Sequence, residues 1–376
     1  MRFNIWKDCP KVPITELLSF IVDNRGKTVP TADDGWKLIA TNCVTNNTLF
    51  PVYEKVRYLT QETYETWFRA HPMPGDILFV NKGTPGRVCL VPDPVDFCIA
   101  QDMIALRADD EKIYNKYLFA VLRSREIQQQ IYNTNVGDVI PHFKKQFMDQ
   151  LLIPIPDRRI QEIIGNLYYE LSYKTELNKK INKNLEQQAQ AIYSSMFIEH
   201  RQESWSTGQL SDLISVKYGK DHKKLADGNY PVYGSGGIMR YVEKPLYTGE
   251  SVLIPRKGTL NNVMYVNEAF WSVDTMFYTE MLYSNIAKFV YHFVKSKDLA
   301  SMNAGSAVPS MTTNILNAMQ LYIPDEKTLE KFENIVSPMY SAMQENTKES
   351  KILANTRDTL LPKLMSGELD VSVIDL

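Results

Sequence analysis

Apolar residues recur with helical spacing in two long segments of the chain. In the second segment, apolar positions alternate spacings of three and four from Leu329 to Leu364, which is the heptad pattern of a coiled coil. Subtracting 168 from these numbers gives a matching series from Ile164 to Met196. We therefore predict two long helices, each of about 39 residues and roughly 58 Å. Pro338 interrupts the second series, so a kink or an early break is expected there.

Both series become polar near their midpoints. Asn178 and Asn182 occupy seam positions of the first series, and Asn346 and Ser350 occupy those of the second. If the helices pair antiparallel so that facing residue numbers add up to 528, Asn178 faces Ser350 and Asn182 faces Asn346. Buried amides fix register at a cost in stability, so these four residues are predicted to set the register of an antiparallel coiled coil. The alternative is that each helix packs on its own domain and the four side chains face solvent.

A repeated motif precedes each helix. Residues 137–141 read Gly-Asp-Val-Ile-Pro and residues 305–309 read Gly-Ser-Ala-Val-Pro, which gives the shift of 168. Upstream, residues 81–84 (Asn-Lys-Gly-Thr) correspond to residues 256–259 (Arg-Lys-Gly-Thr), with the shift enlarged to 175. The chain thus contains two divergent copies of one unit, each a globular part followed by a long helix. This arrangement suggests a protein that recognises a bipartite target.

Short strand-like runs dominate the globular part of each copy. The first copy has such runs at 36–39 and 76–80 and an expected helix over 115–131, and the second copy has runs at 230–234 and 251–255. We predict an α+β fold of two tandem domains with curled, mixed or mostly antiparallel sheets, separated and joined by the two helices. The predicted boundaries are 1–157 for the first domain, 158–200 for the first helix, 201–324 for the second domain, and 325–376 for the second helix and C-terminal tail.

Composition narrows the possible classes of function. Of 376 residues, 44% are hydrophobic and 23% are charged, which is typical of a well-packed globular protein. The chain has no apolar run near the roughly 20 residues of a membrane span, and its first residues lack a signal peptide's apolar stretch. The four cysteines lie far apart, which predicts reduced thiols and a cytoplasmic protein. A net charge of −2 argues against a generally basic protein but not against local basic faces.

The sequence shows no pattern typical of a catalytic or metal site. Residues 26–28 resemble the end of a P-loop, but Ile21 occupies the position of the required glycine. The segment beginning at Gly234 resembles a dinucleotide fingerprint, but Met239 replaces its third glycine. The five histidines show no i, i+4 pairing, so zinc is not expected. We therefore predict that this chain is not an enzyme and holds no cofactor or metal of its own.

Several loops combine a cation with glycine and small hydrogen-bonding residues. Glycine lets the backbone approach a phosphate, lysine or arginine neutralises the phosphate, and Asn, Ser and Arg can meet base edges. A single loop of this kind is more often a solvated turn, but the recurrence of Lys-Gly-Thr after equivalent strands favours a nucleic-acid interface. The predicted DNA-binding residues are Lys27, Thr28, Asn42, Lys82, Thr84, Arg87, Asn135, His142, Lys144, Lys220, Tyr233, Ser235, Arg240, Arg256, Lys257, Thr259, Asn261, Asn303, Ser306 and Ser310.

These motifs together resemble the specificity subunits of type I restriction-modification systems. The resemblance is carried by residues 230–237 (Tyr-Pro-Val-Tyr-Gly-Ser-Gly-Gly), 254–258 (Ile-Pro-Arg-Lys-Gly), 177–182 (Leu-Asn-Lys-Lys-Ile-Asn) and 360–369 (Leu-Leu-Pro-Lys-Leu-Met-Ser-Gly-Glu-Leu). It covers essentially the whole chain and implies two target-recognition domains and two spacer helices. The first domain departs from the pattern, because residues 39–42 read Ile-Ala-Thr-Asn where the second domain has Tyr-Gly-Ser-Gly.

The resemblance implies a non-catalytic subunit that binds an asymmetric, bipartite DNA site, with one domain for each half and the paired helices setting the gap. It implies that two modification subunits, which methylate adenine, dock on the helices, and that motor-nuclease restriction subunits join them. S-adenosylmethionine, ATP and Mg are expected only on those partners, and no membrane contact is expected. The alternative is a coiled-coil adaptor that joins proteins without contacting DNA, and such an adaptor has no reason to place Lys82 and Lys257 equivalently.

Overall fold

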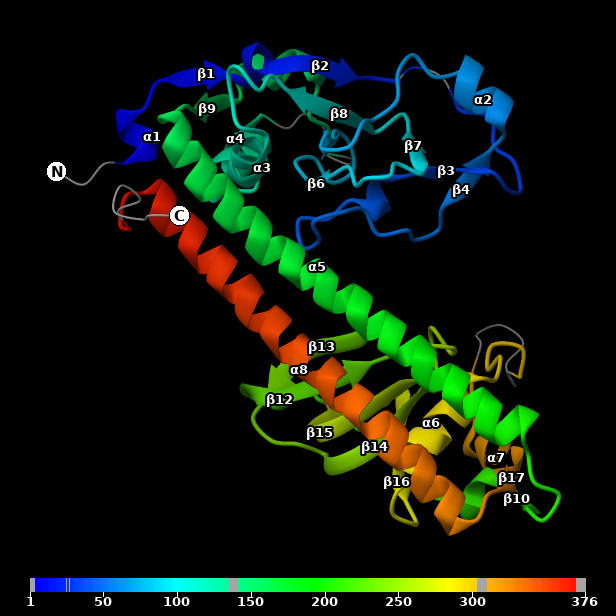
Figure 1. Cartoon of the computed structure of the whole chain (residues 1–376). Coiled ribbons are helices and arrows are strands. Elements are labelled where there is room, and N and C mark those ends of the chain that lie inside the picture. The colour runs from blue at the N-terminus through cyan, green and yellow to red at the C-terminus, as the bar shows by residue number, and fades with distance from the viewer. Residues whose placement is uncertain (1–3, 25, 27, 135–140, 303–309, 370–376) are drawn as a thin grey trace. The chain divides into compact units, whose positions relative to one another are not determined.

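A computed structural model describes residues 4–24, 26, 28–134, 141–302 and 310–369 of the chain (Figure 1). The chain divides into two units: unit 1 comprises Met1–Lys180 and Glu345–Leu376, and unit 2 comprises Ile181–Gln344. Two long helices, α5 (Arg158–Ser194) and α8 (Glu326–Met365), each contribute residues to both units. None of the helices in the described part of the chain carries an apolar stretch long enough to cross a membrane.

The described residues of unit 1 form three small sheets. The antiparallel sheet β2-β8-β5-β6 has four strands, β4-β3-β7 has three, and β1 pairs with β9. The other elements of this unit are, in chain order, α1 (Ile5–Asp8), β1 (Lys11–Pro13), β2 (Leu18–Val22), β3 (Trp36–Ile39), β4 (Arg57–Leu59), α2 (Gln61–Thr66), β5 (Ile77–Val80), β6 (Val88–Leu90), β7 (Phe97–Ile99), β8 (Met103–Ala108), α3 (Asn115–Leu122), α4 (Arg125–Asn133) and β9 (Leu152–Pro154).

In the part of unit 2 that the structure describes, six strands form one larger sheet in the order β11-β16-β14-β15-β12-β13, and β10 pairs with β17 apart from it. Its elements are, in chain order, β10 (Ser206–Gln209), β11 (Ile214–Tyr218), β12 (Asp227–Gly234), β13 (Gly237–Val242), β14 (Tyr247–Pro255), β15 (Met264–Ser272), β16 (Met276–Met281), α6 (Ala287–Lys295), α7 (Thr313–Asn317) and β17 (Gln320–Ile323). The helix α6 is buried along its length against this sheet.

The two units share one uncommon strand pairing. In unit 1, β3 pairs parallel with β7, and Leu38 lies opposite Cys98. In unit 2, β12 pairs parallel with β15, and Val232 lies opposite Trp271. The other pairings between the named strands are antiparallel, so the equivalence of residues 36–39 and 230–234 extends to how these strands are paired. The predicted fold class, α+β with two tandem domains and long helices, is confirmed.

One local prediction is wrong, and a second is narrowed. The helix expected over 115–131 is two helices, α3 and α4, because Ser124 accepts a hydrogen bond from the Ile127 N–H at 3.4 Å and starts a new helix. At Pro338, where a kink or an early break is expected, α8 continues without a break. Val336 and Tyr340, on either side of the proline, are buried in the core of unit 2, which stabilises the helix despite the missing N–H.

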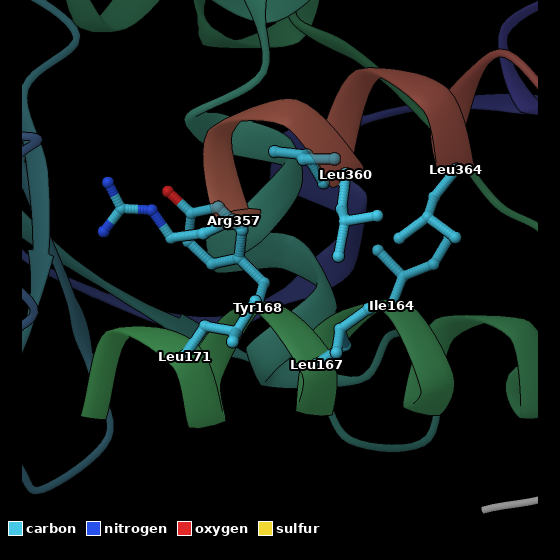
Figure 2. Close-up of a pocket in the computed structure, with 8 residues that line it drawn as sticks. Ile164, Leu167, Tyr168, Leu171, Arg357, Leu360 and Leu364 are labelled. Carbon is cyan, nitrogen blue, oxygen red and sulfur yellow. The ribbon is translucent and has the colours of Figure 1, made fainter. Parts of the chain in front are cut away.

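Within unit 1, the first part of α5 and the last part of α8 run antiparallel. Their apolar seam includes Ile164, Leu167 and Leu171 on α5 and Leu360 and Leu364 on α8 (Figure 2). The seam continues into the core of unit 1, which includes the buried residues 117–122 of α3. Burial of such side chains contributes about 1.5–3 kcal/mol each.

Within unit 2, the last part of α5 and the first part of α8 pack together on α6. Phe332 of α8 contacts Phe197 at a ring separation of 5.1 Å and Tyr193 at 6.2 Å. Phe289 of α6 contacts the same two rings at 4.8 and 5.7 Å. Each unit therefore contains its own antiparallel pair of helical segments packed on its own helix and sheet.

Candidate nucleic-acid interface

The Lys82 loop of unit 1 follows strand β5. The N–H groups of Asn81 and Lys82 both donate to the carbonyl oxygen of Asp102, at 2.8 and 3.3 Å. Lys82 forms an isolated antiparallel bridge with His142, and the Phe143 N–H donates to the Asn81 carbonyl at 2.7 Å. The backbone is thus held on both sides, and the lysine side chain is exposed.

The Lys257 loop of unit 2 follows strand β14 and is built in the same way. The N–H groups of Arg256 and Lys257 both donate to the carbonyl oxygen of Thr275, at 2.9 and 3.2 Å. Lys257 forms an isolated antiparallel bridge with Ser310, and the Met311 N–H donates to the Arg256 carbonyl at 2.9 Å. Five positions of one loop therefore have counterparts in the other, in the same hydrogen-bonding roles.

A glycine with positive φ follows each lysine. Gly83 has a φ of +84° and Gly258 a φ of +86°, a conformation that favours glycine over other residues. A Cβ atom on Gly258 would also lie 2.6 Å from the hydroxyl oxygen of Ser235. The glycines are required by the turn itself, whereas nothing in the turn requires the exposed lysines before them. The lysines therefore need another explanation, which binding of an anion would give.

In unit 2 the turn between β12 and β13 packs against the Lys257 loop. Asn262 donates its side-chain amide to the Ser235 carbonyl at 2.7 Å. Tyr233 precedes the turn and donates its hydroxyl to Glu268 at 2.8 Å. Burial and this carboxylate raise the pKa of Tyr233 well above its usual value, so the phenol stays protonated. The two glycine-containing motifs that the sequence singled out in unit 2 thus form one surface.

The predicted DNA-binding residues differ in their exposure to solvent and in whether their side chains already form hydrogen bonds within the protein. Arg240 is bound by Asp227 at 2.7 Å and by the Leu225 carbonyl at 3.0 Å. The side-chain amide N–H of Asn261 donates to Asp298, and its side-chain oxygen accepts from the Ala300 N–H. The side-chain amide of Asn42 donates to the Glu54 carbonyl. The exposed ones are Thr28, Asn42, Lys82, Arg87, Lys144, Lys220, Lys257, Thr259 and Asn261. The partly buried ones are Thr84, His142, Tyr233, Ser235, Arg240, Arg256 and Ser310. The remaining four, Lys27, Asn135, Asn303 and Ser306, lie outside the described residues.

Two side chains that sequence reasoning missed lie beside the Lys82 loop. A depression of about 390 Å³ in unit 1 is lined by Arg69 and Gln101 together with Lys82 and His142. Arg69 follows an aromatic-rich stretch, which is a weak sequence signal for a binding loop. No sequence pattern pointed to Gln101, because its position depends on a turn that the neighbouring residues do not predict.

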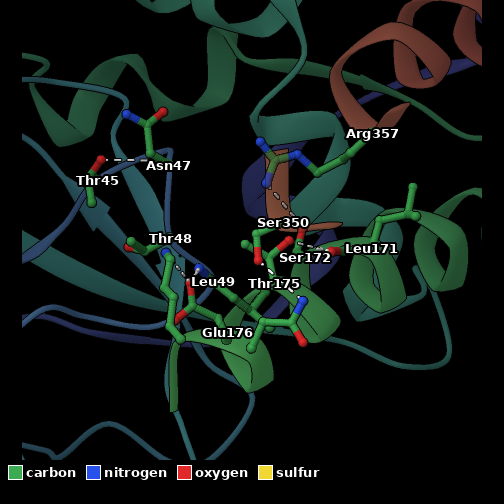
Figure 3. A network of polar contacts seen from close by, with 12 residues as sticks. Thr45, Asn47, Thr48, Leu49, Leu171, Ser172, Thr175, Glu176, Ser350 and Arg357 are labelled. Atoms are coloured by element: carbon green, nitrogen blue, oxygen red, sulfur yellow. Dashed lines mark hydrogen bonds and ion pairs between the residues drawn. The ribbon is translucent and has the colours of Figure 1, made fainter. Parts of the chain in front are cut away.

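The polar midpoint of the helix pair in unit 1 centres on Asn178, whose side chain is fully buried. Its amide group lies 2.6 Å from a carboxylate oxygen of Glu349, 3.3 Å from the Ser350 hydroxyl and 3.3 Å from the Asn346 carbonyl. Asn178 therefore does not face solvent, and it contacts the residue that an antiparallel sum of 528 places opposite it. Ser172, Thr175 and Arg357 continue this polar stretch (Figure 3).

Asn182 makes its contact within unit 2. Its side-chain amide donates to the Met343 carbonyl at 3.1 Å. Within the described residues, no three His, Cys, Asp or Glu side chains gather in a way that could hold a metal ion.

Comparison with known proteins assigns the class. The family described as "Type I restriction modification DNA specificity domain" matches the chain twice, over residues 13–187 and 202–353. The chain therefore belongs to this family and carries two copies of its domain. Specificity subunits are the non-catalytic component of type I systems, which agrees with the prediction that the chain is not an enzyme.

Individual relatives are distant but extend over most of the chain. The MjaIX type I restriction enzyme specificity subunit of Methanocaldococcus jannaschii is 19% identical over 340 residues, which cover 79% of this chain and 78% of that protein. A putative type I specificity subunit of Mycoplasma genitalium is 22% identical over 312 residues, which cover 77% and 80%. The crystal structure of a type I S subunit from M. genitalium shares the fold with a TM-score of 0.62 at 19% identity, over 95% of this chain and 96% of that one.

Proposed function

We propose that the chain is the DNA sequence-recognition subunit of a type I restriction-modification system and binds an asymmetric, bipartite DNA site. Each unit reads one half of the site through the surface around its lysine loop. Because the two units differ in the residues around these loops, the two half-sites differ in sequence, in contrast to the palindromic site of a symmetric dimer.

The observation that carries this proposal is the matched construction of the Lys82 and Lys257 loops. Both lysines are exposed, and both precede a glycine with positive φ. In each loop the N–H groups of the lysine and of the residue before it donate to a single carbonyl. A fixed backbone with a mobile cation is suited to a phosphate, which carries charge but no sequence information. The neighbouring side chains, which differ between the units, are then available for bases.

The helices have a separate role in the proposal. They set the gap between the half-sites and carry the docking surface for two adenine-methylating modification subunits, which restriction subunits join. S-adenosylmethionine, ATP and Mg belong to those partners and not to this chain. Asn178, Asn182, Asn346 and Ser350 fix the register of the pairing, since a buried amide without its partner costs about 1–3 kcal/mol.

The competing candidate is a coiled-coil adaptor that joins proteins without contacting DNA. The helix pairs alone are compatible with such an adaptor. The lysine loops favour the DNA-binding subunit instead, because protein adaptors gain nothing from two equivalent exposed lysines at the ends of β5 and β14.

Deletion and complementation in the host test the proposal. Methylome sequencing should show a bipartite adenine motif that disappears when the gene is deleted and returns with the wild-type chain. The double variant Lys82→Ala and Lys257→Ala should restore methylation only in part. In vitro, the salt dependence of DNA binding by its complex should fall by about two in slope, since each phosphate neutralised contributes about 0.9.

Lys244→Ala provides the matched control, because Lys244 is exposed in the connection between β13 and β14, away from both long helices and outside both loops. It should restore methylation fully and leave the slope unchanged. A motif that persists after deletion, or a double variant with an unchanged slope and full methylation, would favour the adaptor.

A further inference from the structure

The depression in unit 1 brings together five separate segments of the chain. Its lining includes Asp23, Arg69, Lys82, Gln101 and Asp102, along with His142. A surface for phosphate alone would be basic, but this one holds carboxylates, cations and a carboxamide side by side. Such a mixture matches base edges, which present donors and acceptors together in the major groove.

Gln101 is held in a strained turn at this site. Its φ is +60°, and the Asp102 N–H donates to the Ala100 carbonyl at 2.9 Å, so three residues close a tight γ-turn around it. A residue other than glycine is strained in this conformation, and residues strained in this way cluster at functional sites. The same turn directs the Asp102 carbonyl to the Lys82 loop, so Gln101 and Lys82 are fixed relative to each other.

Arg69 is fixed at the depression by a buried asparagine. Asn24 accepts the Arg69 N–H at 2.9 Å and donates to the carbonyls of Ala70, at 2.9 Å, and Ile99, at 3.2 Å. Asn24 thereby ties the Arg69 segment to the end of β7, two residues before Gln101. The guanidinium of Arg69 also donates to the Asp23 carbonyl at 3.3 Å.

Asn81 adds an acceptor at the same place. It lines the depression and is fully buried, and its amide group donates to the Phe143 carbonyl at 3.2 Å. Its side-chain oxygen has no hydrogen-bond partner among the described residues. Buried acceptors without a partner are uncommon, so packing and hydrogen bonding alone do not account for this residue beside the depression.

We infer that this depression is the base-reading site of unit 1 and that Gln101 and Arg69 are its specificity-determining residues, which rests on the proposed DNA-recognition function. Glutamine pairs with the N6 and N7 atoms of adenine and arginine with the O6 and N7 atoms of guanine. Lys82 binds the adjoining phosphate, and Asn24 is a positioning residue for Arg69.

Unit 2 forms the corresponding connection differently. There the Met276 N–H donates to the Val273 carbonyl at 2.9 Å in a four-residue turn, and Asp274 occupies the place of Gln101. The non-glycine residues with positive φ in the described part of the chain are Lys55, Gln101 and Asn285, so Asp274 does not share the strained conformation. The inference therefore concerns one half-site only.

Selection of DNA from a randomised duplex pool by the full chain in its complex, followed by sequencing, tests the inference. Gln101→Gly removes the side chain and suits the positive φ, and Arg69→Ala removes the guanidinium. Each variant should lower base discrimination about 5- to 150-fold at one or two positions, the equivalent of 1–3 kcal/mol for a good bidentate contact. All affected positions should lie in one half-site, and the other half-site should be unchanged.

Lys55→Gly is the matched control, because it relieves the same backbone conformation in unit 1 at an exposed residue outside the depression. It should leave the selected sequence unchanged. Variants that select the wild-type sequence in both halves overturn the inference while the proposed function stands. A wild-type complex that selects no two-part sequence overturns the proposed function itself.

Discussion

In unit 1, helix α5 packs on α3 through Gly165, whereas in unit 2 helix α8 packs on α6 through Glu333. The two positions correspond at the shift of 168. A Cβ atom on Gly165 would lie 2.6 Å from the backbone nitrogen of Tyr117, so the two helices of unit 1 are in backbone contact. In unit 2 a carboxylate occupies the equivalent place and binds Lys288 of α6 at 2.6 Å.

The contact in unit 2 belongs to a buried network of charges. The side chain of Lys288 is only 5% exposed and lies between Glu333 and Glu250, the latter at 2.9 Å. Burial opposes ionisation of Glu250, but hydrogen bonds from Tyr265 and Lys288 outweigh it and lower the pKa of that carboxyl. Glu250 therefore stays ionised near neutral pH.

A second part of the network surrounds His292. Its Nδ1 lies 2.8 Å from the Gln190 side-chain oxygen on α5, and its Nε2 lies 2.9 Å from the Tyr340 hydroxyl on α8. Both parts of the helix pair in unit 2 are thus attached to α6 by directed polar contacts. The close helix packing of unit 1 resists sliding of one helix along the other, and its stability does not depend on pH. The polar contacts of unit 2 also define one geometry, but their strength depends on the charges of the groups involved.

The largest effect is expected from breaking the charge network. Lys288→Met leaves Glu250 and Glu333 without their cation, and removing one partner of a buried ion pair destabilises by about 3–5 kcal/mol. Native-state hydrogen exchange should show the loss of protection in α6, with α3 of unit 1 as the internal reference.

A second substitution distinguishes charge from packing. Adding Glu333→Gln to Lys288→Met removes one of the unpaired charges, so part of the lost stability should return. If the single variant is as stable as the wild type, the network does not hold unit 2 together, and the comparison with unit 1 loses its basis.

The next effect is a dependence of stability on pH that should be much larger in unit 2 than in unit 1. Burial lowers the pKa of His292 to about 4, and the nearby charges of Glu186 and Lys295 act in opposite directions. The unfolded chain binds this proton near pH 6.5, so the contribution of the neutral imidazole is complete above pH 6.5 and is lost as the pH falls towards 4. The difference corresponds to about 3 kcal/mol.

Hydrogen exchange at several pH values, corrected for intrinsic rates, measures this loss. Protection of α6 should fall between pH 6.5 and 4, while that of α3 should change much less over the upper part of this range. His292→Gln lacks the titrating group and should flatten the dependence. Equal pH profiles in the two units would contradict the assignment of His292.

The elements of this fold that depend on local pattern could be predicted from the sequence. The heptad seams and the duplicated strands were visible because helical and alternating patterns extend over neighbouring residues. The Lys82 and Lys257 loops could be matched because the repeat placed them after equivalent strands. The matching backbone hydrogen bonds, from the Lys82 loop to Asp102 and from the Lys257 loop to Thr275, then follow because the two units repeat the same arrangement of strands.

Contacts between distant residues could not be predicted in this way. Lys288 lies in an apolar helix, and its partners are 38 and 45 residues away, so nothing nearby indicated a buried ion pair. Gly165 lies in a helix in which glycine is unfavourable, and only the position of α3 explains it. Gln101 depends on a three-residue turn, and Arg69 on the buried amide of Asn24, neither of which has a periodic pattern.

Gly165→Ala tests the close packing of unit 1 and carries the smallest of the expected effects. The added Cβ would meet two backbone atoms, the Tyr117 nitrogen at 2.6 Å and the Lys116 carbonyl carbon at 2.9 Å, so the helices must separate. Overpacking of this kind costs about 1–3 kcal/mol, against about 1 kcal/mol gained from the better helix propensity of alanine. Protection of α3 should therefore fall and that of α6 should not.

Glu170→Ala is the matched control on the same part of α5. The Glu170 carboxylate is exposed and lies 3.8 Å from Lys116, and a surface ion pair of this kind contributes little to stability. It should leave the protection of α3 nearly unchanged. If Gly165→Ala instead stabilises unit 1, helix propensity outweighs the backbone contact. The two units would then differ in their polar network alone, and the packing of α5 on α3 would have no special role.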